Sequence, residues 1–144
     1  KNPEATAEVR QFGWHHTGDV GVMDDEGFIT IVDRKKDMII TGGFNVFPNE
    51  VEQVLNSHPA VQDCAVIGVP DEKWGEAVNA IVQLKAAHEC SEEILIALCK
   101  RELGGVKAPK SIEFIDDLPR SSAGKVLKTE LRKKHWQGRK RAVN

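Results

Sequence analysis

An acidic residue on a glycine turn is the first side chain that could do chemistry. Residues 14–19 read WHHTGD, so Asp19 directly follows Gly18. A carboxylate on such a turn can accept hydrogen bonds from the two neighbouring hydroxyls of a ribose. Asp is also frequent in turns without any function, because its side chain bonds to the local backbone. Asp19 is therefore a candidate nucleotide contact, and an ordinary turn residue is the simpler alternative.

Five consecutive charged residues and a later glycine pair form the second candidate. Residues 33–37 read DRKKD, and Gly42-Gly43 follow the short apolar run after them. Charges between two apolar runs are typical of a solvated hairpin turn. The glycine pair is more informative, because glycine allows a positive φ or the close approach of a ligand to the backbone.

A lysine in a small-residue loop is the third candidate. Residues 118–126 read LPRSSAGKV. They do not match a phosphate-binding P-loop, because Pro119 stands in place of the first glycine and Val126 in place of the Ser or Thr. A flexible Ser/Gly loop that presents Lys125 still suits a site containing phosphate. The alternative is an exposed surface lysine, since lysine is almost never fully buried.

Two further features give weaker signals. His15 and His16 have no third ligand at a regular spacing, so we expect no metal site. Basic triplets at residues 132–134 and 139–141 raise nucleic-acid binding as one function class. The net charge of −2 favours a tail of solvated charge instead, so we expect no nucleic-acid partner.

Length and composition fit one compact domain: 144 residues, 40% hydrophobic and 29% charged. No apolar run reaches the 18 residues of a transmembrane helix. Three cysteines without a CxxC pair indicate reduced thiols and a cytoplasmic protein, with Cys64 and Cys99 in the core. The chain opens KNPEA without an initiator Met, so we expect it to be a piece of a longer or processed protein.

The pattern of apolar residues predicts an α+β fold, with a small sheet of few strands flanked by about three helices. We expect strands at residues 28–32, 38–41, 61–69, 77–84 and 112–115, and helices at 48–56, 91–103 and 129–136. Ser91 is the expected N-cap of the second helix, and Gly104-Gly105 its end. A Gly-rich segment without its own core precedes this domain, and the boundary lies at about Asp33, where five charged residues begin.

In their order and spacing, these motifs resemble the C-terminal region of the adenylate-forming enzymes, which include acyl-CoA synthetases, luciferases and the adenylation domains of peptide synthetases. The resemblance runs along the whole chain. It rests on residues 13–19, on 33–39 with Gly42-Gly43 and 48–52, and on 118–120 with Gly124-Lys125. Residues 66–71 (VIGVPD), 74–76 (WGE) and 136–139 (WQGR) look most like long-chain fatty acyl-CoA ligases.

The resemblance implies a two-step reaction in which ATP and a fatty acid give acyl-adenylate and pyrophosphate, and CoA then gives acyl-CoA and AMP. Residues 1–33 would be the end of the N-terminal adenylation domain and the approach to a hinge, and residues 34–144 the mobile C-terminal domain. Asp19 and Arg34 would bind the nucleotide, and Lys36 would be the hinge. Gly42 and Gly43 would lie along CoA, and Lys125 would be the catalytic residue of adenylation.

The resemblance also defines what this chain lacks. The family's large N-terminal domain, with its phosphate loop and acyl pocket, has no counterpart here, so we expect the chain alone to be inactive. Its partners would be that N-terminal domain, the fatty acid, ATP and CoA, with Mg²⁺ used by the intact enzyme but not bound by this chain. A stand-alone, non-catalytic binding or interaction module of the same fold is the alternative.

Overall fold

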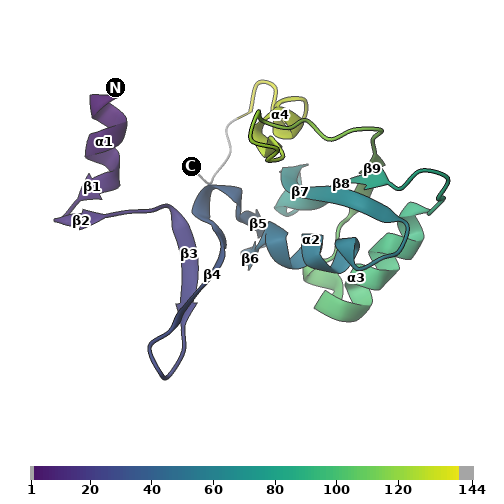
Figure 1. The fold of residues 1–144 in the computed structure, drawn as a ribbon, viewed down its shortest axis with the longest axis horizontal. Coiled ribbons are helices and arrows are strands. Elements are labelled where there is room, and N and C mark those ends of the chain that lie inside the picture. Colours follow the sequence, from purple (N-terminus) through teal and green to yellow (C-terminus); the bar gives the residue numbers. More distant parts are fainter. Residues whose placement is uncertain (1, 140–144) are drawn as a thin grey trace.

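The computed structural model describes residues 2–139, and they fall into an N-terminal segment and a body (Figure 1). The segment extends away from the body and contains α1 (Pro3–Val9), β1 (Arg10–Gln11), β2 (Trp14–His15), β3 (Asp19–Met23) and β4 (Ile29–Arg34). The body contains η1 (Lys35–Asp37), β5 (Ile39–Thr41), β6 (Phe44–Val46), α2 (Pro48–Asn56), β7 (Val61–Asp71), β8 (Gly75–Leu84), α3 (Glu92–Lys107), β9 (Ser111–Phe114) and α4 (Lys128–Lys133).

The N-terminal segment consists of local structure. Its strands form two separate antiparallel hairpins, β1 with β2 and β3 with β4. The Asn2 side chain accepts a hydrogen bond from the Ala5 amide at 3.1 Å and so caps α1, with Pro3 in the first turn. Within residues 2–38 no side chain is buried, so the segment has no core of its own.

The body is built around β8, the central strand of a sheet. The antiparallel strand β7 pairs along one edge of β8, with Val61 opposite Leu84 and Asp71 opposite Gly75. On the other edge β5 pairs at the start of β8, and β9 pairs in parallel further along. The short strand β6 continues the sheet beyond β5.

Helices cover both faces of this sheet, which is why its central strands are almost continuously apolar. Successive residues of β7 alternate between two clusters: Cys64 and Val66 join the larger one with α2 and α3, and Ala65 and Ile67 join the smaller one with α4. The buried residues of the helices are Pro48, Val51 and Leu55 of α2, Leu95 and Cys99 of α3, and Leu131 of α4. The predicted α+β class, with three helices against a small sheet, is therefore confirmed for the described residues.

Most predicted elements of the body are found, with shifted ends. The helix at 48–56 has the predicted bounds, and α3 runs four residues beyond the predicted end. Gly104, the expected terminator, does break the helical geometry with a φ of +80°, but the helical turns resume after it. Ser91 occupies the N-cap of α3 without a capping hydrogen bond from its side chain. Elements α1, β1, β2, β3 and β6 were not predicted.

Candidate functional site

Asp19 and Arg34, the two candidate nucleotide contacts, lie opposite each other in one hairpin. Asp19 begins β3 and Arg34 ends β4, and their Cα positions are paired. The Arg34 Nε lies 3.0 Å from Asp19 Oδ1. The pair is partly open to solvent, with 58% of the Arg34 side chain and 28% of the Asp19 side chain exposed. A carboxylate accepts through both oxygens, so the ion pair leaves acceptor capacity for ribose hydroxyls.

A hollow of about 410 Å³ lies beside this pair. Its lining includes Glu8, His16, Gly18 and Arg34 of the N-terminal segment and Lys36 of η1. The cations in its lining suit an anionic ligand, because opposite charges attract more strongly at a partly shielded surface than in bulk water. The structure thus brings Arg34 and the hinge candidate Lys36 to one hollow, next to Asp19.

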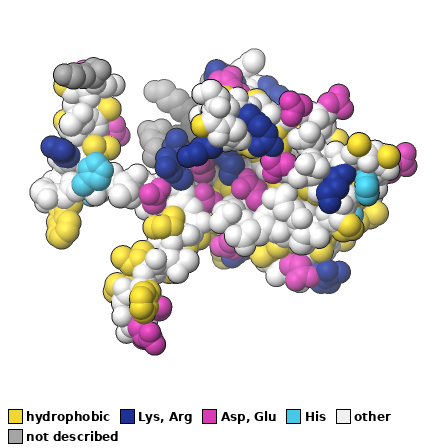
Figure 2. Space-filling model, in the orientation of Figure 1, with side chains coloured by type: hydrophobic (Ala, Val, Ile, Leu, Met, Phe, Trp, Pro, Cys, Tyr) yellow, Lys and Arg dark blue, Asp and Glu magenta, His cyan; other side chains and the backbone are white. Residues whose placement is uncertain are grey.

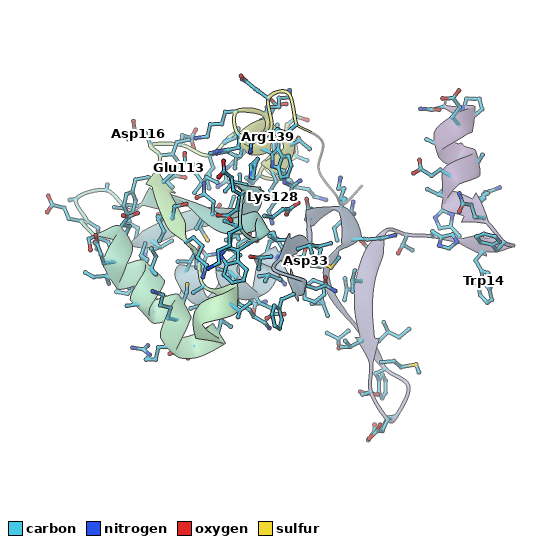
Figure 3. All side chains as sticks on the ribbon, turned by 180° about the vertical axis from the view of Figure 1, so that it is seen from behind. Trp14, Asp33, Glu113, Asp116, Lys128 and Arg139 are labelled. Carbon is cyan, nitrogen blue, oxygen red and sulfur yellow. The ribbon has the colours of Figure 1, made fainter. Side chains whose placement is uncertain are left out.

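Lys36 lies in η1, the short turn between the last strand of the segment and the first strand of the body. Its position therefore agrees with a junction between two parts of the chain. The boundary at Asp33 is less sharp than expected, because Asp33 Oδ2 accepts a hydrogen bond from the Asn49 amide at the start of α2, at 2.8 Å. In Figure 3 Asp33 lies where the segment meets the body, and Trp14 lies far out on the segment.

Gly42 and Gly43 form the two-residue turn between β5 and β6, with φ of +56° and +84°. Tight hairpins of this kind need positive φ at both central residues, which explains why both are glycine. The surroundings differ: a Cβ on Gly42 would lie 2.5 Å from Trp74 Cε3, whereas one on Gly43 would meet nothing within 4 Å. Gly42 is thus fixed by packing, and Gly43 is open to a ligand.

Lys125 lies on a turn that is more ordered than the flexible loop expected from its composition. The Ser121 amide donates to the Lys125 carbonyl and the Gly124 amide to the Ser121 carbonyl, both at 2.8 Å. Arg120 donates to the Gly124 carbonyl and forms an ion pair with Asp63 of β7, which ties the turn to the sheet. The Lys125 side chain is exposed, and within residues 2–139 its ammonium has no hydrogen-bond or ion-pair partner.

The candidate residues are therefore divided among three places. Asp19, Arg34 and Lys36 lie together at the junction, Gly42-Gly43 lie at the edge of the sheet, and Lys125 lies on its own turn before α4. Sequence reasoning missed Arg120 as the anchor of that turn. No local pattern could have identified it, because its partner Asp63 is 57 residues away.

All three residues of the basic triplet at 132–134 form ion pairs, and only Arg132 is largely buried. Arg132 pairs with Asp37 at 2.6 Å, Lys133 with Glu130 at 2.6 Å, and Lys134 with Glu113. The expectation of a solvated charged tail is wrong for Arg132, whose side chain is only 11% exposed. Lys140 and Arg141 of the second triplet lie outside the described residues.

The cysteines behave as predicted core residues. Cys64 and Cys99 are buried, and Cys90 is half-buried. Burial raises the pKa of the Cys99 thiol to about 11, and burial together with the charge of Glu52 raises that of Cys64 still further. Neither thiol is therefore a reactive nucleophile at neutral pH.

Among residues 2–139, no group of three or more His, Cys, Asp and Glu side chains could hold a metal ion. In the same range, every helix is too short or too polar to span a membrane.

Comparison with known proteins shows the family to which this fold belongs. The family described as "AMP-binding enzyme C-terminal domain" matches residues 50–125. The long-chain-fatty-acid–CoA ligase of Escherichia coli is 53% identical over 132 residues, which cover 92% of this chain and 23% of the ligase. The feruloyl-CoA synthase of an Amycolatopsis species is 49% identical over 92% of this chain and 27% of its own length.

A solved structure has the same arrangement of elements. The o-succinylbenzoate CoA synthetase from Bacillus subtilis, in complex with its acyl-adenylate intermediate, matches with a TM-score of 0.84 and 40% identity over 91% of this chain and 27% of that one. The chain thus spans about a quarter of the length of the proteins it matches. It belongs to the AMP-binding enzymes, as the C-terminal domain of that family, and its relatives include ligases that act on fatty acids.

Proposed function

We propose that this chain is the mobile C-terminal domain of an ATP-dependent carboxylate–CoA ligase that uses a fatty acid. The intact enzyme joins the fatty acid to AMP with release of pyrophosphate. The CoA thiol then attacks the adenylate carbonyl, forms acyl-CoA and displaces AMP. The names of the relatives support the ligase class. Fatty acid is the substrate class of the E. coli relative, which is more similar to this chain than the feruloyl-CoA synthase.

The observation that carries the proposal is the presentation of Lys125. A hydrogen-bonded turn, anchored to β7 by the Arg120–Asp63 ion pair, presents an exposed ammonium that forms no ion pair within residues 2–139. In adenylation a carboxylate and the α-phosphate must approach each other, so a preorganised cation stabilises the transition state. Asp19 and Arg34 would bind the nucleotide on the other side of the Lys36 hinge.

The N-terminal segment supports a large partner domain in the same polypeptide. Its exposed apolar side chains include Phe12 (89% exposed), Trp14 (75%) and Met23 (71%). In Figure 2 hydrophobic side chains, drawn in yellow, gather on the N-terminal segment and along its β3–β4 hairpin. Exposed apolar surface on such a scale marks an interaction surface. We propose that the N-terminal adenylation domain covers it and supplies the acyl pocket and most contacts to ATP and Mg²⁺.

Domain rotation explains how one chain serves both half-reactions. Turning about Lys36 would withdraw Lys125 after adenylation and bring Gly43 alongside the pantetheine arm of CoA, where its open surroundings allow a close approach. The three free thiols agree with our proposal of a cytoplasmic enzyme.

The experiment compares the purified chain with the proposed full-length ligase in an ATP–pyrophosphate exchange assay. We expect exchange with a fatty acid only for the full-length protein. Exchange by the chain alone would contradict the division of the active site. A full-length protein that binds ATP without exchange for any carboxylate would favour the non-catalytic module.

A further inference from the structure

Helix α4 carries two half-buried ion pairs on one of its faces. Lys128 Nζ lies 2.7 Å from Glu52 Oε1, and Arg132 Nη2 lies 2.6 Å from Asp37 Oδ1. The two cations are four residues apart, so they point to the same side of the helix. All four side chains are 18% exposed or less. Figure 3 shows Lys128 near the centre of the body.

The two pairs connect α4 to different parts of the chain. Glu52 belongs to α2, inside the body, and also accepts a hydrogen bond from the Val66 amide of β7 at 2.7 Å. Asp37 is the last residue of η1 and directly follows Lys36. Because α4 begins three residues after Lys125, the Arg132–Asp37 pair is a bridge between the lysine turn and the residue beside the hinge.

The energetics of such a pair indicate a role in geometry more than in stability. A buried ion pair loses hydration that its attraction only partly recovers, so apolar residues of similar volume would stabilise the fold as well or better. The Nε of Arg132 is also buried, and within residues 2–139 it has no hydrogen-bond partner. An unpaired buried donor costs free energy. The pair instead fixes one orientation of Asp37 relative to α4.

We propose that Arg132 is a positioning residue for adenylation, an inference that rests on the proposed function of Lys36 and Lys125. By holding Asp37 on α4, Arg132 makes the end of the hinge and the Lys125 turn move as one rigid body. Rotation is then confined to the backbone at Lys36. The Lys125 side chain then returns to the same position in each catalytic cycle, because the connection from Lys36 to the Lys125 turn does not deform.

The first test uses the whole chain and requires no catalysis. The Met38 amide donates to the carbonyls of Arg34 and Lys35, at 3.2 and 3.3 Å, and reports directly on η1. We expect Arg132→Met to speed hydrogen exchange at Met38 about tenfold, as local opening becomes easier. Lys128→Met removes the other pair on the same helix face and should leave Met38 unchanged. If both variants speed hydrogen exchange at Met38 equally, Arg132 contributes only general packing, and the proposal is overturned.

The second test measures the half-reactions of the proposed full-length ligase. Arg132→Met should lower the kcat of adenylation on the order of 10- to 100-fold, because small misplacements of a reacting group are that costly. The KM values for ATP and fatty acid should stay the same, since the Arg132 side chain is only 11% exposed and is engaged with Asp37. Asp37→Asn, which keeps the shape of the pair, should show the same split if Arg132→Met does not fold.

A charge exchange completes the design. Asp37→Arg combined with Arg132→Asp should recover part of the activity that each single change loses. An equal loss of adenylation in Arg132→Met and Lys128→Met would overturn the positioning role but not the proposed function. The same holds if the double variant Asp37→Arg, Arg132→Asp recovers no activity. If Lys125→Ala left adenylation intact, the proposed function would fail instead, and the exchange rate of Met38 would still decide whether Arg132 holds the hinge.

Discussion

Gly42 and Gly43 occupy one turn, but the space around their Cα atoms differs. The Gly42 amide donates to the Trp74 carbonyl at 2.9 Å, and the indole ring closes over Gly42. Nothing covers Gly43. At the residue scale, the pair therefore combines a packing requirement at one position with an open backbone at the other.

We expect Gly42→Ala to lower the free energy of unfolding by about 2–4 kcal/mol, the sum of overpacking against Trp74 and left-handed strain. Gly43→Ala should cost only the strain, about 1 kcal/mol. Chemical denaturation of both variants measures the difference. Adding Trp74→Ala should remove most of the excess at Gly42, so equal costs at the two glycines, or no such coupling, would disprove the packing argument.

Glu113 gives a prediction about pH at the same scale. Burial raises the pKa of its carboxyl, but hydrogen bonds from Lys134 and Asn79 outweigh burial and lower the pKa below the ordinary 4.5. A lowered folded pKa means that the carboxylate contributes stability above about pH 4.5 and loses it as pH falls through the folded pKa. Glu113→Gln should therefore be less stable than the parent at neutral pH, with a gap that narrows on acidification. A gap independent of pH, measured by denaturation from pH 7 to 3, would contradict this.

At the scale of elements, the proposed hinge depends on the turn η1. It is the chain connection between a hairpin without buried side chains and a body with two apolar clusters. Asp33 ties the hairpin to α2 just before η1, and Arg132 ties Asp37 to α4 at its end. Lys36 lies between these two attachments, in the middle of η1.

Lys36→Pro tests the hinge in the proposed full-length ligase. Proline fixes φ near −65° and so restricts the orientations available to the body. We expect one half-reaction to be impaired far more than the other, because each needs a different orientation. Separate assays of adenylation, and of thioester formation from pre-formed acyl-adenylate, measure the two half-reactions independently. Equal losses in a folded variant would speak against rotation at Lys36.

The elements also show what local sequence can predict. Helix α2 followed from Pro48 and the spacing of its apolar residues, and the central strands followed from the alternating pattern of residues 61–69 and 77–84. Helix α1 was missed although Asn2-Pro3 is a start signal, because no apolar face follows it. Strand β3 was interpreted as turns, since Gly18 and Gly21 outweighed its β-branched residues. The Asp37–Arg132 pair spans 95 residues, and only the folded sheet brings its partners together.

At the scale of the whole molecule, the chain is a folded body with an attached segment that exposes apolar side chains (Figure 1, Figure 2). The body presents one exposed lysine on an anchored turn, and the segment holds the paired Asp19 and Arg34. Adenylation would need both parts around one nucleotide, and thioester formation would need the lysine withdrawn. The proposed function therefore depends most on what Lys125 does in each half-reaction.

The most direct measurement is the rate of each half-reaction in Lys125→Ala of the proposed full-length ligase, with Lys100→Ala on the exposed face of α3 as the matched control. Adenylation should fall by at least about 100-fold, or roughly 2.7 kcal/mol, the lower range for losing one preorganised donor. Thioester formation from pre-formed acyl-adenylate and CoA should change far less, and Tm should stay the same because Lys125 packs against no core. Lys100→Ala should change neither rate. Adenylation by Lys125→Ala at the parent rate would contradict the account.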